Sequence, residues 1–194
     1  MDEDKKRELF DKIAFDHIDS LYDTALRLTR DSMSAEDLVQ DTYMRAFRFF
    51  EKFEPGTNFK AWIFKILMNT FINQYRKKSR EPQKVKFEKV EFATENPASE
   101  SEFGPWEGYD PSLYQNLYDD DIKNALEKLS DDFRMVVMLA DVEGFSYKEI
   151  AEIIEHPIGT VMSRLSRGRK MLQSHLKQYA IEHGYIKEND INTE

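Results

Sequence analysis

The sequence predicts an all-α protein made of two small helical domains joined by a flexible acidic linker. Apolar residues recur at helical spacing through residues 1–80 and again through residues 119–180. Between them, residues 81–118 lose this periodicity and mix acidic residues with Pro, Gly and Ser. Residues 181–194 are expected to form a frayed tail, because little apolar periodicity remains there.

The net charge of −9 is concentrated in the middle of the chain. Residues 1–80 carry 15 basic and 14 acidic side chains, and residues 122–194 carry 10 and 12. Residues 81–121 carry 3 basic against 11 acidic side chains. Because local patches rather than global charge decide binding, the acidic total does not exclude a nucleic-acid partner.

The first two helices of the N-terminal domain are expected at residues 9–29 and Ala35–Phe50. Asp31 to Ser34 break the helical pattern between them, and Ser34 is a candidate N-cap for the second helix. The second helix buries an apolar stripe and leaves an opposite polar face. That face is either simply solvated or binds a partner; its candidate residues are Asp37, Gln40, Asp41 and Arg45.

A third helix is predicted from Asn58, as its N-cap, to about Ser79. It is apolar on two sides and has no acidic residue from Phe59 to Arg80. Such a helix is either sandwiched within a core or presents aromatic side chains to a partner. Asn69 and Asn73, next to a basic end, also suit the binding of unstacked single-stranded bases. The alternative is that one of these amides braces the loop after residue 50.

Three consecutive aspartates at 119–121 have two explanations. They suggest either a metal site or negative charge at the N-terminus of a helix over residues 122–129, and the helix dipole favours the second. Ser130 is then expected to cap a helix over residues 131–141.

Residues Phe145–Lys170 predict a helix-turn-helix. Ser146 and Glu149 have the spacing of a capping box, and Pro157 suits the first turn of a second helix. Gly159 and Ala151 are small, as two closely crossing helices require.

The second helix of this motif has two distinct faces. Val161, Leu165, Gly168 and Leu172 fall on one side, which is expected to be buried. The outward side combines short polar groups with cations, as reading duplex DNA requires. Its candidate residues are Met162, Ser163, Ser166, Arg167 and Lys170, with Arg164 and Arg169 on the flanks. The alternative is a helical hairpin whose solvated face is basic.

Several classes of function are excluded or left without support. The chain has no Cys, which excludes disulfides, thiolate zinc sites and cysteine nucleophiles. The four His residues are far apart, and no nucleotide-binding, metalloprotease or hydrolase motif occurs. We therefore expect no enzyme activity, no cofactor and no metal. The charged N-terminus and the lack of a long apolar run predict a cytoplasmic protein without membrane insertion.

Four motifs in this order resemble the extracytoplasmic-function sigma factors of bacterial RNA polymerase, which contain only sigma domains two and four. The motifs are LYDTALRLTRD (21–31), AEDLVQDTYMRAFRFFEKF (35–53), NFKAWIFKILMNTFINQYRKKSR (58–80) and FSYKEIAEIIEHPIGTVMSRLSRGRKML (145–172). The resemblance covers about residues 9–80 and 119–178, and each motif alone is much less specific than the set.

The resemblance implies roles for individual residues. It implies that Asp37, Gln40, Asp41 and Arg45 bind the clamp helices of the polymerase beta-prime subunit. It implies that Phe53, Asn69 and Asn73 hold a flipped base of the minus-ten element, with Arg76 and Lys77 near its backbone. It implies that the outward residues of the last helix face the minus-thirty-five element. Many relatives carry Arg or Lys where this chain has Met162, which puts one base contact in question.

The resemblance also implies partners: the polymerase core through its beta-prime clamp helices and beta flap, promoter DNA, and an anti-sigma factor. The P-I-G-T-V-M-S-R segment is similar to a subgroup that answers thiol-oxidative stress, although a chain without Cys would depend on its anti-sigma factor to sense thiols. Two rival interpretations are a one-component helix-turn-helix regulator, which would bind duplex DNA alone, and an enzyme acting on nucleic acid.

Overall fold

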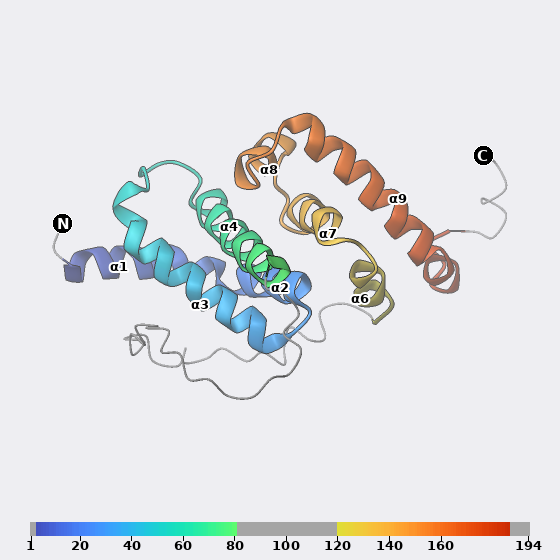
Figure 1. Ribbon diagram of the computed structural model, residues 1–194, viewed down its shortest axis with the longest axis horizontal. Coiled ribbons are helices and arrows are strands. Elements are labelled where there is room, and N and C mark those ends of the chain that lie inside the picture. The colour runs from blue at the N-terminus through green and yellow to red at the C-terminus, as the bar shows by residue number, and fades with distance from the viewer. Residues whose placement is uncertain (1–2, 81–119, 187–194) are drawn as a thin grey trace.

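The computed structural model describes residues 3–80 and 120–186, and the prediction of an all-helical fold with two helical domains is confirmed (Figure 1). The predicted linker and residues 187–194 lie outside the described residues. The N-terminal domain contains α1 (Glu3–Ala14), α2 (Ile18–Thr29), α3 (Ser32–Phe49) and α4 (Phe59–Arg80). The C-terminal domain contains α6 (Asp120–Glu127), α7 (Asp131–Val137), α8 (Tyr147–Ile153) and α9 (Ile158–Glu182).

The first predicted helix is divided in two by a 3-10 turn at Phe15–His17. The backbone N–H of Ile18 bonds to the carbonyl of Phe15, so the carbonyl of Ala14 loses its usual helical donor. The buried hydroxyl of Tyr43 donates to that carbonyl at 2.7 Å. Burial raises the pKa of Tyr43, which keeps the hydroxyl protonated as a donor. A contact with α3 therefore stabilises the break, and helical periodicity alone could not reveal it.

The residue that caps the start of α3 is not the predicted one. The carboxylate of Asp31, and not the hydroxyl of Ser34, caps the helix and accepts from the backbone N–H of Ser34 at 2.8 Å. Arg30 precedes this cap in the left-handed conformation with φ of 64° and ends α2. The two helices are thus joined by a connection too short for a cap at Ser34.

Helix α4 packs both apolar sides into the core, the first of the two alternatives that its apolar pattern allowed, although Trp62 stays partly exposed. Phe59 and Ile63 are buried on one side, and Phe64 and Met68 are buried on the other. The predicted cap is confirmed, because Asn58 Oδ1 accepts from the backbone N–H of Ala61 at 3.1 Å.

The C-terminal domain departs from the predicted 131–141 helix at a π-helical segment, Met138–Val142. The backbone N–H of Glu143 bonds to the carbonyl of Met138 at 3.0 Å, five residues back. Ser130 lies at the N-cap of α7 as predicted, but its side chain makes no capping bond. Asp120 and Asp121 lie in the first turn of α6, where the helix dipole favours negative charge.

The two domains pack against each other, which the sequence did not predict. Helix α8 lies beside α4 (Figure 1), and one hydrophobic core cluster extends through both domains. The rings of Phe64 and Phe145 meet at 5.2 Å across the junction. Beside them, the carboxylate of Glu143 is 2.9 Å from Lys60 Nζ and accepts from the Thr24 hydroxyl at 3.0 Å. The Glu143 side chain is only 4% exposed and that of Lys60 is 30% exposed, so the carboxylate of this ion pair is buried between the domains while its cation stays partly exposed.

His17 lies at the edge of the same junction. Its ring stacks on Phe59 at 5.7 Å between centroids. Burial lowers the pKa of His17, and the nearby positive charge of Lys60 adds to the effect. Both effects favour the neutral imidazole beside the Lys60–Glu143 pair, while the charges of Asp16 and Glu143 oppose them.

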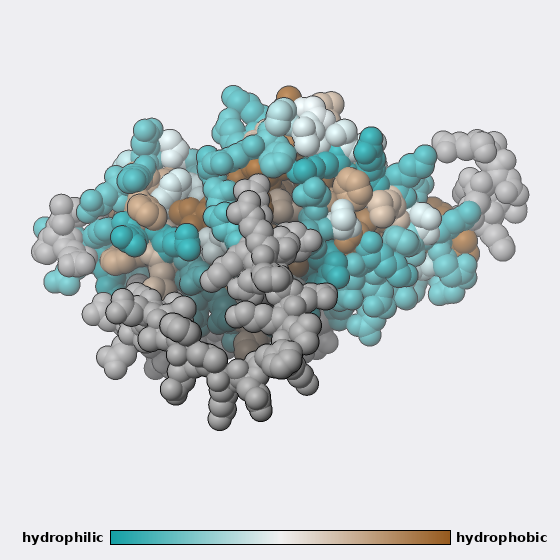
Figure 2. All heavy atoms as spheres, viewed as in Figure 1, coloured by the Kyte–Doolittle hydropathy of each residue, from teal (hydrophilic) through white to brown (hydrophobic). Residues whose placement is uncertain are grey.

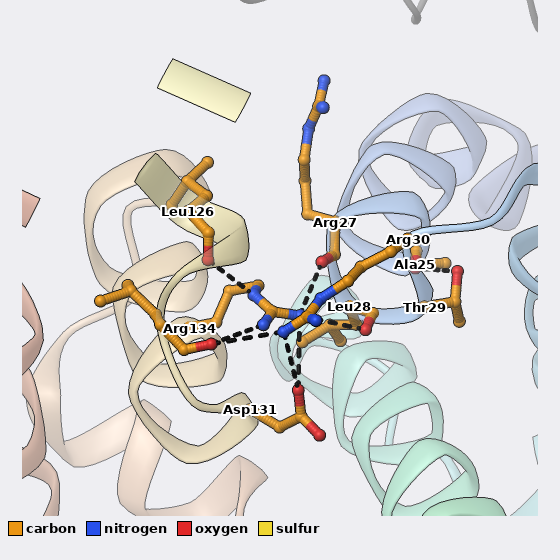
Figure 3. A network of polar contacts seen from close by, with 9 residues as sticks. Ala25, Arg27, Leu28, Thr29, Arg30, Leu126, Asp131 and Arg134 are labelled. Atoms are coloured by element: carbon orange, nitrogen blue, oxygen red, sulfur yellow. Dashed lines mark hydrogen bonds and ion pairs between the residues drawn. The ribbon is translucent and has the colours of Figure 1, made fainter. Parts of the chain in front are cut away.

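Arg134 makes the second connection between the domains (Figure 3). It is fully buried, and Figure 3 shows its guanidinium between α2 and the end of α6. It donates to Leu126 O at 2.9 Å and Leu129 O at 2.6 Å, and across the junction to Arg27 O at 3.2 Å and Leu28 O at 3.3 Å. Asp131 supplies a carboxylate at 3.4 Å. One cation thus satisfies carbonyls at the C-terminal ends of two helices.

We predict that Arg134→Met lowers the free energy of unfolding by at least about 3 kcal/mol, because each buried carbonyl left without a donor costs roughly 1–3 kcal/mol. Urea unfolding followed by circular dichroism measures this loss. Arg30→Met is the matched control, since Arg30 contacts the same Leu129 carbonyl and Asp131 carboxylate from an exposed position. The control should change stability by less than about 1 kcal/mol. Equal losses in both variants would contradict the assigned role of Arg134.

Candidate nucleic-acid interface

The helix-turn-helix begins with the predicted capping box. Ser146 Oγ accepts from the backbone N–H of Glu149 at 3.3 Å, and Glu149 Oε2 accepts from the backbone N–H of Ser146 at 2.9 Å. The hydrogen bonds from the Ser146 backbone and hydroxyl lower the pKa of Glu149. Phe145 and Ile150 are both buried, as a hydrophobic staple over this cap requires.

A tight turn then separates α8 from α9. Glu155 adopts the left-handed conformation with φ of 54°, which few residues other than Gly adopt without strain. Pro157 is the N-cap of α9, and its carbonyl accepts from the backbone N–H of Thr160 at 2.8 Å. After this turn, Val161 and Leu165 of α9 are buried, while Met162 and Ser163 on the other side of the helix are exposed.

The glycine that permits close helix packing is Gly168, not Gly159. A Cβ added at Gly159 would meet nothing within 4 Å, so the prediction for that residue was wrong. A Cβ at Gly168 would lie 2.9 Å from Cγ2 of Val137, where α9 crosses α7. The close approach is thus between α9 and the helix before the motif, and sequence proximity to the turn was misleading.

The predicted faces of α9 are confirmed by burial. Val161, Leu165 and Gly168 are buried, Leu172 is only partly buried, and the predicted outward residues are exposed. These exposed residues are Met162, Ser163, Ser166, Arg167 and Lys170. Among the described residues, Arg167 and Lys170 have no acidic partner, so both cations remain available to phosphate or base edges.

The two flanking arginines are paired within their own domain. Arg164 is 2.9 Å from Asp132, and Arg169 makes a two-pronged contact with Asp141, with Nε to Oδ2 at 3.1 Å. The hydrogen bond to Asp141, and to a lesser extent the one to Tyr147, raises the pKa of Arg169 above its usual value. These carboxylates offset part of the positive charge on the flanks. The sequence did not predict this pairing, because both acids come from the neighbouring α7 and its π-helical continuation.

Helix α4 carries a second candidate surface. Trp62, Ile66, Asn69 and Asn73 follow one another at spacings of four, three and four residues and therefore share one side of the helix. The first three are partly buried and Asn73 is exposed, and neither asparagine side chain bonds to another described residue. Phe53 extends the surface, with its ring 5.4 Å from that of Trp62. The side chains of Arg76 and Lys77 lie outside the described part of the structure.

The predicted polar face of α3 is exposed in part. Asp37, Gln40 and Arg45 are exposed, but Asp41 is half-buried and accepts from Gln74 Nε2 at 3.1 Å. Two residues that the sequence analysis missed belong to this face: Met33, 72% exposed, and Met44, 44% exposed. Methionines on an otherwise charged helix were the sequence signal that could have revealed these two residues.

On the side drawn in Figure 2, hydrophobic residues form small groups in a mostly hydrophilic surface.

Comparison with known proteins identifies both domains. Residues 16–81 match the family Sigma-70 region 2, and residues 119–172 match Sigma-70, region 4. The chain is 34% identical over 157 residues to the sigma factor EcfG of Rhodopseudomonas palustris, covering 81% of this chain and 79% of that protein. The chain belongs to the extracytoplasmic-function sigma factors. These proteins act in transcription initiation and are not enzymes, so the predicted family and the absence of catalytic function are confirmed.

Other relatives support the same family assignment. SigE of Mycolicibacterium smegmatis is 33% identical over 177 residues, covering 89% of this chain, which spans 63% of the length of that relative. The sigma factor RpoE of Bartonella quintana, solved in complex with the anti-sigma factor NepR, is 37% identical with a TM-score of 0.64. That match covers 87% of this chain and 96% of the solved one. CnrH, solved with the cytosolic domain of CnrY, shares the fold at 22% identity and a TM-score of 0.60.

No helix within residues 3–80 or 120–186 combines the length and apolar character needed to span a membrane.

The packing of α9 on α7 predicts opposite effects for two Gly→Ala changes on one helix. Gly168→Ala should lower the free energy of unfolding by about 1–3 kcal/mol, because the added methyl overpacks the contact with Val137. Gly159→Ala should leave stability unchanged or raise it by up to about 1 kcal/mol, because it adds helix propensity in open space. Thermal and urea unfolding measure both. A stabilised Gly168→Ala variant would show that α7 and α9 are not in close contact.

Proposed function

We propose that this sigma factor directs the RNA polymerase core to promoters by using its two domains on two different forms of DNA. The C-terminal domain reads the minus-thirty-five element as duplex, and the N-terminal domain captures the melted strand of the minus-ten element. The observation that carries the proposal is the pair of chemically different surfaces on α9 and α4. We place this activity in the cytoplasm, where the polymerase works.

The surface of α9 supports duplex reading. The N-terminal part of the second helix in such a motif enters the major groove, and short polar side chains and cations contact base edges and phosphates there. Ser163, Ser166 and Arg167 are exposed on this part of α9. Arg167 and Lys170 supply charge that no described carboxylate offsets. Arg164 and Arg169, oriented by Asp132 and Asp141, flank this surface and contribute to phosphate contacts more weakly.

The surface of α4 supports capture of an unstacked base. Partly exposed aromatic and apolar side chains can replace the stacking that a base loses when a strand melts. Phe53 and Trp62 supply such rings, and the amides of Asn69 and Asn73 can both donate to and accept from a base edge. From the family resemblance, we also assign Arg76 and Lys77 to contacts with the strand backbone.

The face of α3 supports binding to the polymerase core. The two exposed methionines and Arg45 favour a protein interface, because Met and Arg are enriched at interfaces over the rest of the surface. We assign Asp37, Gln40, Asp41 and Arg45 to the beta-prime clamp helices, with Met33 and Met44 as apolar contacts between them. The beta flap is the proposed partner of the C-terminal domain.

An anti-sigma factor is the proposed regulator. The Bartonella quintana sigma factor, which is 37% identical and matched along 96% of its chain, was solved with NepR bound. By similarity, we propose that a protein of this kind holds the present chain inactive until a stress signal releases it.

Promoter binding should depend on the core enzyme. The purified chain should show weak binding to promoter duplex, and adding core polymerase should produce tight, sequence-specific binding, as gel-shift titration can measure. Tight specific binding by the chain alone, unchanged by core polymerase, would instead favour a one-component regulator.

Asp41→Ala should weaken core association, because it removes a carboxylate from the α3 face. The matched control is Gln74→Ala, which removes the same Asp41–Gln74 hydrogen bond but leaves the carboxylate in place. Each variant should lose about 1 kcal/mol of stability from that bond. Affinity for core polymerase, measured by fluorescence anisotropy, should fall for Asp41→Ala only. If both variants bind core equally well, Asp41 has a structural role.

Asn69→Ala should lose about 1–3 kcal/mol of affinity for the minus-ten strand on a pre-melted promoter bubble, the usual value of a good base contact. It should retain core association and minus-thirty-five duplex binding. Asn124→Ala, an exposed amide on α6, is the control and should behave as the wild type. If Asn69→Ala lost both thermal stability and core binding, Asn69 would have a structural role in bracing the loop, and not a role in base capture.

A further inference from the structure

The start of α9 exposes a pair of apolar side chains. Ile158 is 49% exposed and Met162 is 52% exposed, and the two lie one turn apart. Val161 and Leu165 already fill the core side of the same turns and are fully buried. A single exposed apolar residue is ordinary, but this pair stands within the part of the helix assigned to base reading.

The chemistry of Met162 limits what it can recognise. Its thioether has no hydrogen-bond donor, so it cannot bind phosphate or the acceptors of guanine. The nearest cation on its flank is Arg169, two turns later, and Asp141 and Tyr147 hold that guanidinium. This flank therefore offers an apolar and flexible contact beside the polar contacts of Ser163 and Ser166.

The major groove of DNA presents one apolar group, the C5-methyl of thymine. Methionine fits such a group well, because its unbranched and polarisable side chain adapts to an irregular surface. Guanine and cytosine present only donors and acceptors there, and a buried thioether would leave these without partners.

We propose that Met162, supported by Ile158, reads the C5-methyl of a thymine in the minus-thirty-five element. The inference rests on the proposed function of α9 and gives it one specific contact. Specificity at this base pair comes from an apolar contact, whereas the neighbouring positions are read through hydrogen bonds from Ser163, Ser166 and Arg167.

The test uses the full chain with core polymerase and a duplex selected from a library randomised upstream of the start site. Each thymine of the selected upstream element is then replaced singly by uracil, which lacks only the C5-methyl. The wild type should lose affinity about fourfold at one such position, the effect expected from one buried methyl group. Met162→Leu should keep this loss, because it remains apolar.

Met162→Gln, of similar size but polar, should bind the thymine and uracil duplexes equally. Gln173→Ala, an exposed change further along α9, is the control and should keep the wild-type preference. The inference is overturned if no uracil substitution affects the wild type, or if Met162→Gln keeps the same preference. It is also overturned if Met162→Gln leaves DNA binding unchanged and weakens only an anti-sigma complex. If the holoenzyme selects no upstream sequence, the proposed function itself fails, and the inference fails with it.

Discussion

The buried guanidinium of Arg134 is the interaction on which the arrangement of the two domains depends. Its donors serve the carbonyls of Leu126 and Leu129 in its own domain and those of Arg27 and Leu28 in the other. These carbonyls lie at or just beyond the C-terminal ends of α6 and α2, where helices lack internal donors and where their dipoles favour a cation. A single side chain thus donates hydrogen bonds to the C-terminal carbonyls of two helices and fixes the distance between the domains.

Electrostatics then determines the orientation in which the domains meet. Three ion pairs across the junction each place the cation in the N-terminal domain and the acid in the C-terminal domain. The pairs are Arg30–Asp131, Lys60–Glu143 and Lys65–Glu155. Each domain is nearly neutral, yet their facing surfaces are complementary, and such complementarity selects one register. These contacts leave the outward face of α9 and the Trp62–Asn73 side of α4 accessible, so the junction does not occupy the two candidate DNA surfaces.

Local signals in the sequence predicted the local structure well. The capping box at Ser146, the cap at Asn58 and the two faces of α9 depend on residues within a few positions, and all three are observed. Long-range features were missed. Nothing in the spacing of Arg134 distinguishes a buried cation from a solvated one, and the partners of Arg164 and Arg169 lie on other elements. Gly159 looked structural only because it is near the turn, whereas the constraint at Gly168 is set by Val137.

The π-helical turn at Met138–Val142 sets the phase of the chain that follows it. It holds one more residue than an α-helical turn would, and one residue corresponds to a rotation of about 100°. In the observed phase, Glu143 and Phe145 meet Lys60 and Phe64 of α4. Removing one residue here would leave Glu143 and Phe145 chemically intact but turn both side chains away from α4. The number of residues in this turn, more than their identity, is what keeps the two domains in register.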